Sequence, residues 1–194
     1  MGELSYNKYY DLLANAFVTD PMCMFLFKDD KTRFNVVRKV FAFMFNFGTG
    51  YGHLITTNNV TGIIVYTKSY KVLGSLIKQI KIGAVKLLFG IGIRNFWNIL
   101  CYDKYSQMLH SKYAKPDDYY LYIIAVDPKH HRNGFGGKMI LDLQKNLEKG
   151  ERIYVETSNP DNILFYEKFG FELQDDFHIP KSNVHIWPMI YVRN

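Results

Sequence analysis

The sequence predicts a mixed α/β fold in which a mostly antiparallel central sheet is flanked by helices. Apolar runs rich in aromatic and β-branched residues, typical of strands, alternate with segments of helical periodicity through the centre of the chain. Hairpin patterns lie toward both ends. This order differs from that of a regular doubly wound sheet, in which strands and helices alternate throughout.

The part of the chain before residue 119 is predicted to form four helices and a β-hairpin. The hairpin pairs 51–57 with 60–67 around the turn pair Asn58-Asn59. Gly62, inside the second strand, indicates a bulge or a close backbone approach. Apolar residues recur at helical spacing in four segments, which span 4–18, 29–47, 70–89 and 94–110.

A strand, a glycine-rich turn and a helix follow, and the rest of the chain is organised around them. The strand covers 119–126 and ends at Asp127-Pro128, because proline lacks the N–H group that a sheet needs. Beyond the glycines, residues recur on one helix face at 136, 140, 143 and 147. We therefore expect a helix to begin within the glycine-rich turn.

The C-terminal segment continues with a strand at 152–157, a helix that ends before Gly170, and two further strands. Asn159 suits the N-cap of this helix, and Pro160 suits its first helical position. Residues 171–175 and 184–192 are expected to form the two strands, as antiparallel neighbours.

The 194 residues fit a single domain, in which an N-terminal elaboration at 4–118 precedes a core at 119–193. Hydrophobic residues make up 48% of the chain, which is enough for a sizeable core. Two cysteines form neither a disulfide framework nor a zinc set, which favours a reducing, cytoplasmic location. No signal-peptide pattern is present, and lysines and glycines interrupt the apolar stretch 80–93, so we predict no membrane span.

The net charge of +6 and the isoelectric point of about 9.1 fit a basic surface, an anionic cofactor or nucleic acid. No helix-turn-helix, zinc or RNA-recognition pattern supports nucleic acid. The glycine-rich turn favours an anion, because glycines let backbone N–H groups approach a phosphate at the positive end of a helix. Met139 excludes both a Walker loop and a dinucleotide fingerprint. A tight turn without a ligand is the alternative.

This turn resembles the pyrophosphate-binding loop of the GNAT N-acetyltransferases, Gln/Arg-x-x-Gly-x-Gly/Ala. The matching residues are His131-Arg132-Asn133-Gly134-Phe135-Gly136, with His131 in place of Gln or Arg. A second GNAT-like segment follows at the separation seen in that family, and reads Glu156-Thr157-Ser158-Asn159-Pro160-x-Asn162-x-x-Phe165-Tyr166-Glu167. The resemblance implies the GNAT acyl-CoA N-acyltransferase fold and, without a metal, the transfer of an acetyl group from acetyl-CoA to an amine.

Within the family, the chain looks most like the puromycin N-acetyltransferase-like branch, on Tyr119-Tyr120-Leu121, the second segment and Trp187. The resemblance also implies a set of cofactor-binding residues on the central strand, the turn and the helix near Tyr166. They are Ile124, Ala125, Val126, His131, Arg132, Asn133, Gly134, Phe135, Gly136, Gly137, Lys138, Asn159, Asn162, Phe165 and Tyr166. Helix capping alone is the alternative for Asn159 and Asn162.

Tyr166 and Glu156 are the expected catalytic residues. A tyrosine hydroxyl is protonated at neutral pH and can give its proton to the thiolate that leaves from CoA; packing alone is the alternative for Tyr166. The acceptor's ammonium group must lose a proton before it attacks, and Glu156 is the favoured base, with a purely orienting carboxylate as the alternative. His110 and Asp117 are weaker candidates for the base. The backbone N–H near Val126 is expected to stabilise the oxyanion.

The acceptor is expected to be a small-molecule amine. The family places it beside Glu156 and an aromatic wall, which suits a cationic amine on a flat or apolar body. In this chain the wall would comprise Phe25, Phe27, Tyr120, Tyr122 and Trp187. A protein or peptide acceptor and a non-catalytic acyl-CoA sensor are the alternatives. We expect no nucleic-acid or membrane partner, and a monomer or homodimer.

Overall fold

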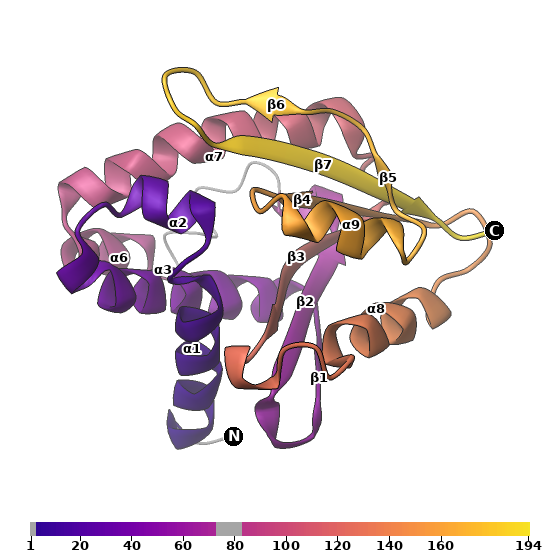
Figure 1. Ribbon diagram of the computed structural model, residues 1–194, viewed down its shortest axis with the longest axis horizontal. Helices are drawn as coiled ribbons and strands as arrows, with labels where there is room; N and C mark the ends of the chain where they lie inside the picture. The colour runs from indigo at the N-terminus through magenta and orange to yellow at the C-terminus, as the bar shows by residue number, and fades with distance from the viewer. Residues whose placement is uncertain (1–2, 73–82) are drawn as a thin grey trace.

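The computed structural model describes residues 3–72 and 83–194. A mixed sheet forms its centre, with strands in the order β1-β2-β3-β4-β7-β5 and with β6 paired to β7 (Figure 1). Only the β3–β4 pair is parallel among the described strand pairs. This confirms the predicted mixed, mostly antiparallel sheet. The strands are β1 (His53–Thr56), β2 (Gly62–Lys68), β3 (Tyr119–Val126), β4 (Arg152–Thr157), β5 (Glu172–Leu173), β6 (Phe177–His178) and β7 (His185–Val192).

Helices cover both faces of this sheet. Those before β3 are α1 (Glu3–Phe17), α2 (Pro21–Leu26), α3 (Asp30–Tyr51), α4 (Ser69–Val72), α6 (Ala84–Ile91) and α7 (Ile93–Tyr113). Most of them pack in a core on one face with Ile63, Val65 and Ile123. The later helices, α8 (Phe135–Lys145) and α9 (Asp161–Glu167), pack on the other face with Ile64 and Leu121. None of the described helices is long and apolar enough to cross a membrane.

The register between β2 and β3 contains a bulge that the sequence did not reveal. Val65 pairs with Ile123 and Tyr66 with Leu121, so Tyr122 is an extra residue on β3. A bulge reverses the alternation of side chains along a strand. Leu121 therefore packs with α8 and α9, whereas Tyr122 and Ile123 both pack on the face of α1 and α3. Of the two alternatives predicted for Gly62, the structure has the close approach, since a Cβ on Gly62 would lie 2.9 Å from Met139 Cε.

The helices of the N-terminal half follow the predicted pattern with three differences. α3 passes through Gly48 and ends at Tyr51, because Gly48 serves a close crossing of helix and sheet: a Cβ there would lie 2.6 Å from Val65 Cγ1. The short helix α2 was not predicted, although Asp20 caps it and Pro21 occupies its first position. Part of the predicted helix 70–89 lies outside the described residues, and α6 continues to Ile91, where Gly92 ends it.

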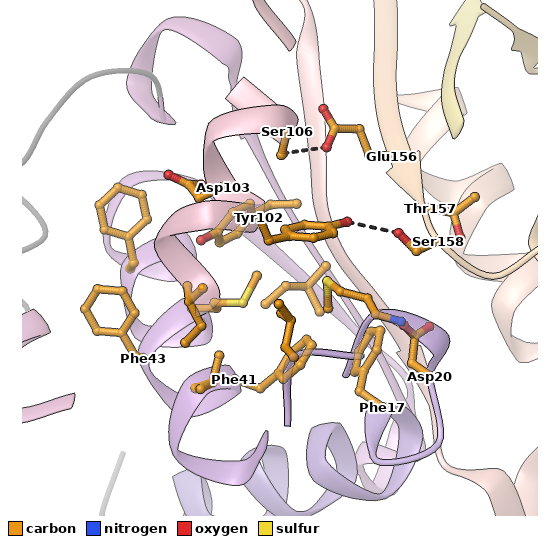
Figure 2. Close-up of a pocket in the computed structure, with 18 of the residues that line it drawn as sticks. Phe17, Asp20, Phe41, Phe43, Tyr102, Asp103, Ser106, Glu156, Thr157 and Ser158 are labelled. Atoms are coloured by element: carbon orange, nitrogen blue, oxygen red, sulfur yellow. Dashed lines mark hydrogen bonds between the residues drawn. The ribbon is translucent and has the colours of Figure 1, made fainter. Parts of the chain in front are cut away.

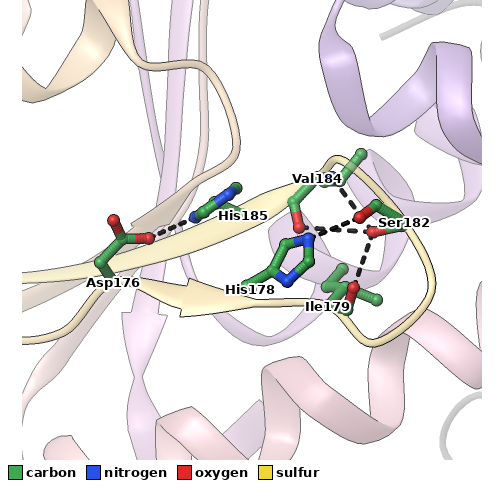
Figure 3. A network of polar contacts seen from close by, with 6 residues as sticks. All are labelled: Asp176, His178, Ile179, Ser182, Val184 and His185. Atoms are coloured by element: carbon green, nitrogen blue, oxygen red, sulfur yellow. Dashed lines mark hydrogen bonds and ion pairs between the residues drawn. The ribbon is translucent and has the colours of Figure 1, made fainter.

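The C-terminal strands are antiparallel neighbours, as predicted, with β5 and the additional strand β6 both paired to β7. Polar contacts fix the turn between β6 and β7 (Figure 3). The Ser182 hydroxyl donates to the carbonyl of Ile179 at 2.9 Å and accepts from the N–H of Val184 at 3.1 Å. The rings of His178 and His185 face one another across the two strands, with centroids 4.8 Å apart. This hairpin carries β7 to its place beside β4.

Candidate active site

β3 and β4 diverge after a short stretch of pairing. Their parallel ladder comprises Tyr119 with Ile153 and Tyr120 with Tyr154, although β3 continues to Val126 and β4 to Thr157. The carboxyl ends of the two strands therefore flank an opening. Tyr120 and Tyr122 are two residues apart, so their side chains lie on the same face of β3, on which Tyr122 packs against the N-terminal helices.

A cavity of about 280 Å³ occupies this opening. Its walls come from α1, the α1–α2 turn, α3, α6 and α7, and from the ends of β3, β4 and the start of α9. Figure 2 shows apolar rings, among them Phe17, Phe41 and Phe43, below a polar rim at α7 and β4. The cavity is thus largely apolar with a few convergent polar groups, which is the usual character of a small-molecule site.

Glu156 lies on this cavity and is held by two hydroxyl groups. Ser106 of α7 donates to Oε2 and Tyr154 of β4 donates to Oε1, each at 2.5 Å. Burial raises the pKa of Glu156 from 4.5 to about 7, a nearby Asp103 raises it further, and the two hydrogen bonds oppose the rise. A carboxyl group with this pKa exchanges protons readily near neutral pH.

Tyr166 and Asn162 of α9 both line the cavity, as their four-residue spacing predicted. Tyr166 is 2% exposed, and burial raises its pKa above the ordinary value, so its hydroxyl keeps its proton at neutral pH. The Asn162 amide donates to the Thr157 hydroxyl at 3.0 Å, which ties α9 to the end of β4. The N-cap of α9 is Pro160 and not Asn159, one residue later than predicted, and the Asn159 Oδ1 accepts from the N–H of Asp161 at 3.1 Å.

The other predicted acceptor residues divide between the cavity and other surroundings. Phe27, Tyr120 and Tyr122 line it, as does His110, whose pKa burial lowers to about 4. Phe25 contacts a separate hollow. Trp187 stands opposite Thr157 in the sheet, and because side chains alternate, it lies on the other face from Glu156. Asp117 is exposed in the turn before β3, so it is not a candidate base.

The glycine-rich turn forms a strand-to-helix connection outside this cavity. Gly134 has φ +78°, which favours glycine, and caps α8. The first helical hydrogen bond runs from the N–H of Lys138 to the carbonyl of Gly134. The N–H groups of Phe135, Gly136 and Gly137 therefore face out from the helix end. His131, Arg132, Asn133 and Lys138 are exposed around them. Such a cradle fits a pyrophosphate.

His131, which departs from the GNAT loop pattern, has a structural role. Its Nε2 lies 3.0 Å from the carbonyl oxygen of Val126, to which it donates when Nε2 carries the proton. This contact ties the turn to the end of β3. Ile124 lies on the cavity, whereas Ala125 is buried in the sheet. Phe165 packs beside the turn, where a Cβ on Gly136 would lie 3.4 Å from its ring.

Several polar residues of the cavity were not found from the sequence. Asp20, Tyr102, Asp103 and Ser106 all line it. Tyr102 Oη lies 3.0 Å from Ser158 Oγ, and burial raises the pKa of Asp20 from 3.8 to about 6. A signal existed on α7, because residues 103, 106 and 110 recur at helical spacing as a polar stripe on an otherwise apolar face.

The comparisons with known proteins agree with this architecture. Residues 99–173 match the model of the acetyltransferase (GNAT) domain. An uncharacterised N-acetyltransferase of Schizosaccharomyces pombe is 24% identical over an alignment of 200 positions, which covers 97% of this chain and 79% of the relative. The fold is similar to that of a Corynebacterium glutamicum protein described as histone acetyltransferase HPA2 and related acetyltransferase, with a TM-score of 0.66, 14% identity, and coverage of 100% of this chain and 94% of that one.

The polyamine N-acetyltransferase of Drosophila melanogaster has a TM-score of 0.55 and 11% identity, with 97% of this chain and 95% of that chain covered. These likenesses confirm the predicted GNAT type of mixed α/β fold. Together with the domain match over residues 99–173, they support an acyltransferase.

Proposed function

We propose that this protein is an acetyl-CoA-dependent N-acetyltransferase that acts on a small-molecule amine. The observation that carries the proposal is the cavity between the diverging ends of β3 and β4, which brings Glu156 and Tyr166 together. One group has a pKa near 7 and the other keeps its proton. A proton acceptor and a proton donor on one cavity are the two groups that direct transfer to an amine requires.

The cofactor-binding residues are those named from the sequence. Acetyl-CoA supplies the acetyl thioester when bound. The N–H groups of the turn at 134–137 would hold its pyrophosphate, with Arg132 and Lys138 adding positive charge. The diverging end of β3, with Ile124, Ala125 and Val126, would hold the arm that leads to the thioester, and the backbone N–H near Val126 would stabilise the oxyanion.

Each catalytic group moves one proton. Glu156 takes a proton from the acceptor's ammonium group, directly or through a water molecule, and leaves an amine able to attack. Ser106 and Tyr154 orient the carboxylate while it does so. Tyr166 holds a proton on Oη and gives it to the departing sulfur. Burial raises the pKa of Cys23, which keeps its thiol protonated, so a covalent acyl-cysteine is not favoured.

A small amine is favoured over a protein lysine by the shape and lining of the cavity. Rings from Phe27, Tyr120 and Tyr122 line the same cavity as Glu156, and aromatic faces attract cations. The Drosophila enzyme of similar fold forms N-acetylagmatine, a small amine product. We further propose that the whole chain acts as a single domain, because one sheet extends from β1 to β5. Membership of the puromycin N-acetyltransferase-like branch stays a prediction.

Two measurements on the purified protein test this proposal: titration with acetyl-CoA, and release of free thiol in the presence of a panel of amines and lysine peptides. Binding followed by thiol release with small amines is the expected result. Binding without release on any acceptor would favour the acyl-CoA sensor, and release with peptides alone would favour a protein acetyltransferase.

A further inference from the structure

The charge of the cavity is opposite to that of the chain. The chain carries a net charge of +6, yet the carboxyl groups of Asp20, Asp103 and Glu156 all line the cavity. Among the lining residues that belong to 3–72 and 83–194 there is no lysine and no arginine. Carboxyl groups in such surroundings are stabilised by a cation from outside the protein.

Two of these carboxyl groups form hydrogen bonds that hold separate parts of the chain in place. Asp20 accepts the N–H of Met22 at 2.9 Å and caps α2, and Glu156 is held by Ser106 and Tyr154. Asp103 is different, because its described hydrogen bond comes from the side chain of Gln107, one turn along the same helix. Its carboxyl group is needed neither to cap α7 nor to join it to another element. Figure 2 shows it at the rim of the cavity.

Asp103 lies about one helical turn from Ser106, the residue of α7 that donates a hydrogen bond to Glu156. Asp103 and Ser106 are three residues apart on α7, so their Cα atoms are separated by about 4.5 Å along the helix axis. Since Ser106 bonds Glu156, the two carboxyl groups face the same cavity at neighbouring levels. Burial raises the pKa of Asp103, and Asp103 in turn raises that of Glu156, which agrees with their proximity.

A buried histidine independently indicates a missing ligand. His110 lines the cavity one turn beyond Ser106, is 2% exposed, and has no hydrogen-bond partner for Nε2. Its ring packs against Tyr120 and Tyr154, with centroids 4.6 Å and 4.9 Å away. Buried polar atoms are rarely left without a partner. With the proton on Nδ1, Nε2 accepts a hydrogen bond, and an ammonium group supplies one.

We propose that the acceptor is a short dicationic amine, in which one amino group reacts beside Glu156 and His110 while the distal cation binds Asp103. This inference rests on the proposed function and names the substrate class of the same site. Asp103 is then the residue that distinguishes diamines from monoamines. The rings of Tyr102, Tyr120 and Tyr122 line the same cavity and suit the carbon chain and its charged ends.

The test compares diaminopentane with pentylamine as acceptors, in the wild type and in Asp103→Asn, by thiol release at saturating acetyl-CoA. We expect the wild type to prefer the diamine in kcat/KM by about tenfold or more. Asp103→Asn should lower the ratio of kcat/KM for the diamine to kcat/KM for pentylamine about tenfold, because any effect of Asp103 on the pKa of Glu156 is common to both acceptors. The matched control is Asp142→Asn, which removes the same charge from the exposed Asp142–Lys145 pair on α8. It should leave kcat/KM unchanged for both acceptors.

Three outcomes would overturn the inference. Equal kcat/KM for both acceptors in the wild type would show that no second cation is recognised, while leaving the proposed function intact. An equal loss of kcat/KM for both acceptors in Asp103→Asn would show that Asp103 acts on the reacting amine or on the fold. The thermal unfolding temperature of the variant distinguishes these two explanations. Failure of the wild type to acetylate any amine despite binding acetyl-CoA would instead refute the proposed function.

Discussion

The Oγ of Ser106 lies 2.5 Å from Oε2 of Glu156 and donates a hydrogen bond to it, joining the middle of α7 to the end of β4 across 50 residues of sequence. This contact fixes one oxygen of the carboxyl group, and the Tyr154 hydroxyl fixes the other. Both donors favour the ionised form, against the effect of burial. The balance leaves Glu156 with a pKa of about 7.

Removing the Ser106 donor should shift the pH dependence of catalysis. In Ser106→Ala the ionised carboxylate loses one hydrogen bond, so the pKa of Glu156 rises above about 7. Because the base must be ionised, the rising limb of the kcat/KM profile moves to higher pH, and the rate at pH 7 falls roughly threefold to tenfold. The exposed Ser111 of the same helix provides the control, since Ser111→Ala should leave the profile unchanged. If the profile does not move in Ser106→Ala, then Glu156 is not the group whose ionisation sets the rising limb.

The ionisation of Glu156 should also lower the free energy of unfolding as the pH rises. Its pKa is 4.5 when unperturbed and about 7 in the folded protein, so between these values the folded state holds a proton that the unfolded chain has lost. The free energy of unfolding therefore falls as the pH rises through this window. Glu156→Gln lacks this contribution, while the contributions of Asp20 and His110 are common to both proteins and cancel in the difference.

We expect urea denaturation to show wild type losing roughly 2–3 kcal/mol relative to Glu156→Gln between pH 4.5 and pH 8. At the same time the variant should lose kcat by about 10²-fold or more, as expected for removal of a general base. The exposed Glu172 supplies the control variant Glu172→Gln. A stability difference that is constant with pH would mean that Glu156 has the same pKa in the folded and the unfolded states.

The sequence was informative where a local pattern defines the position of a residue. The four-residue spacing places Asn162 and Tyr166 on one face of α9, and the resemblance to the GNAT family implied that this face and the strand end at Glu156 line one cleft. The bulge at Tyr122 carries no glycine or other local signature. The sequence therefore could not show on which face of the sheet each β3 side chain lies. Trp187 was misplaced for a related reason, since its face depends on the pairing of β7 with β4.

The acidic groups of the cavity were missed because they come from segments far apart in the chain. Asp20 is a helix cap in its own segment, and Asp103 is one charge on a helix that also exposes Trp97 and Met108. The polar stripe of α7 could have singled out Asp103, but neither segment indicates that Asp20 and Asp103 face one cavity. Only the packing of α7 against β4 brings Asp103 to the level of Glu156.

Tyr166 allows a direct test of the proton donor. Tyr166→Phe keeps the ring, which packs against Phe165 and Phe171, and removes only the hydroxyl group. We expect kcat to fall by ~10²–10⁴ with little change in acetyl-CoA affinity. Tyr191→Phe, next to Phe171 but away from the cavity, is the matched control and should keep full activity. Wild-type kcat in Tyr166→Phe, where chemistry limits the rate, would leave Tyr166 with a packing role.

Substitutions of the three glycines in the turn before α8 should have different effects on folding and on binding. Gly134 needs its positive φ, and a Cβ on Gly137 would lie 2.5 Å from the ring of Phe169, so substitution at either strains the fold itself. Gly136 has a conformation open to other residues, and its Cβ would meet Phe165 at an ordinary 3.4 Å. Gly136 is therefore the position at which binding can be tested with the least effect on folding.

In Gly136→Val the branched side chain should cover the N–H groups at the start of α8 and keep a pyrophosphate from approaching them. We expect the dissociation constant for acetyl-CoA, measured by calorimetry, to rise at least tenfold, as a loss of about 1.4 kcal/mol or more would give. Gly137→Ala should instead lower the melting temperature, because the ring of Phe169 must move. Gly50→Val, placed where a Cβ meets no atom within 4 Å, controls for the substitution itself. A folded Gly136→Val protein with unchanged affinity would show that the pyrophosphate binds elsewhere, and the positive end of α8 would then be only the start of a helix.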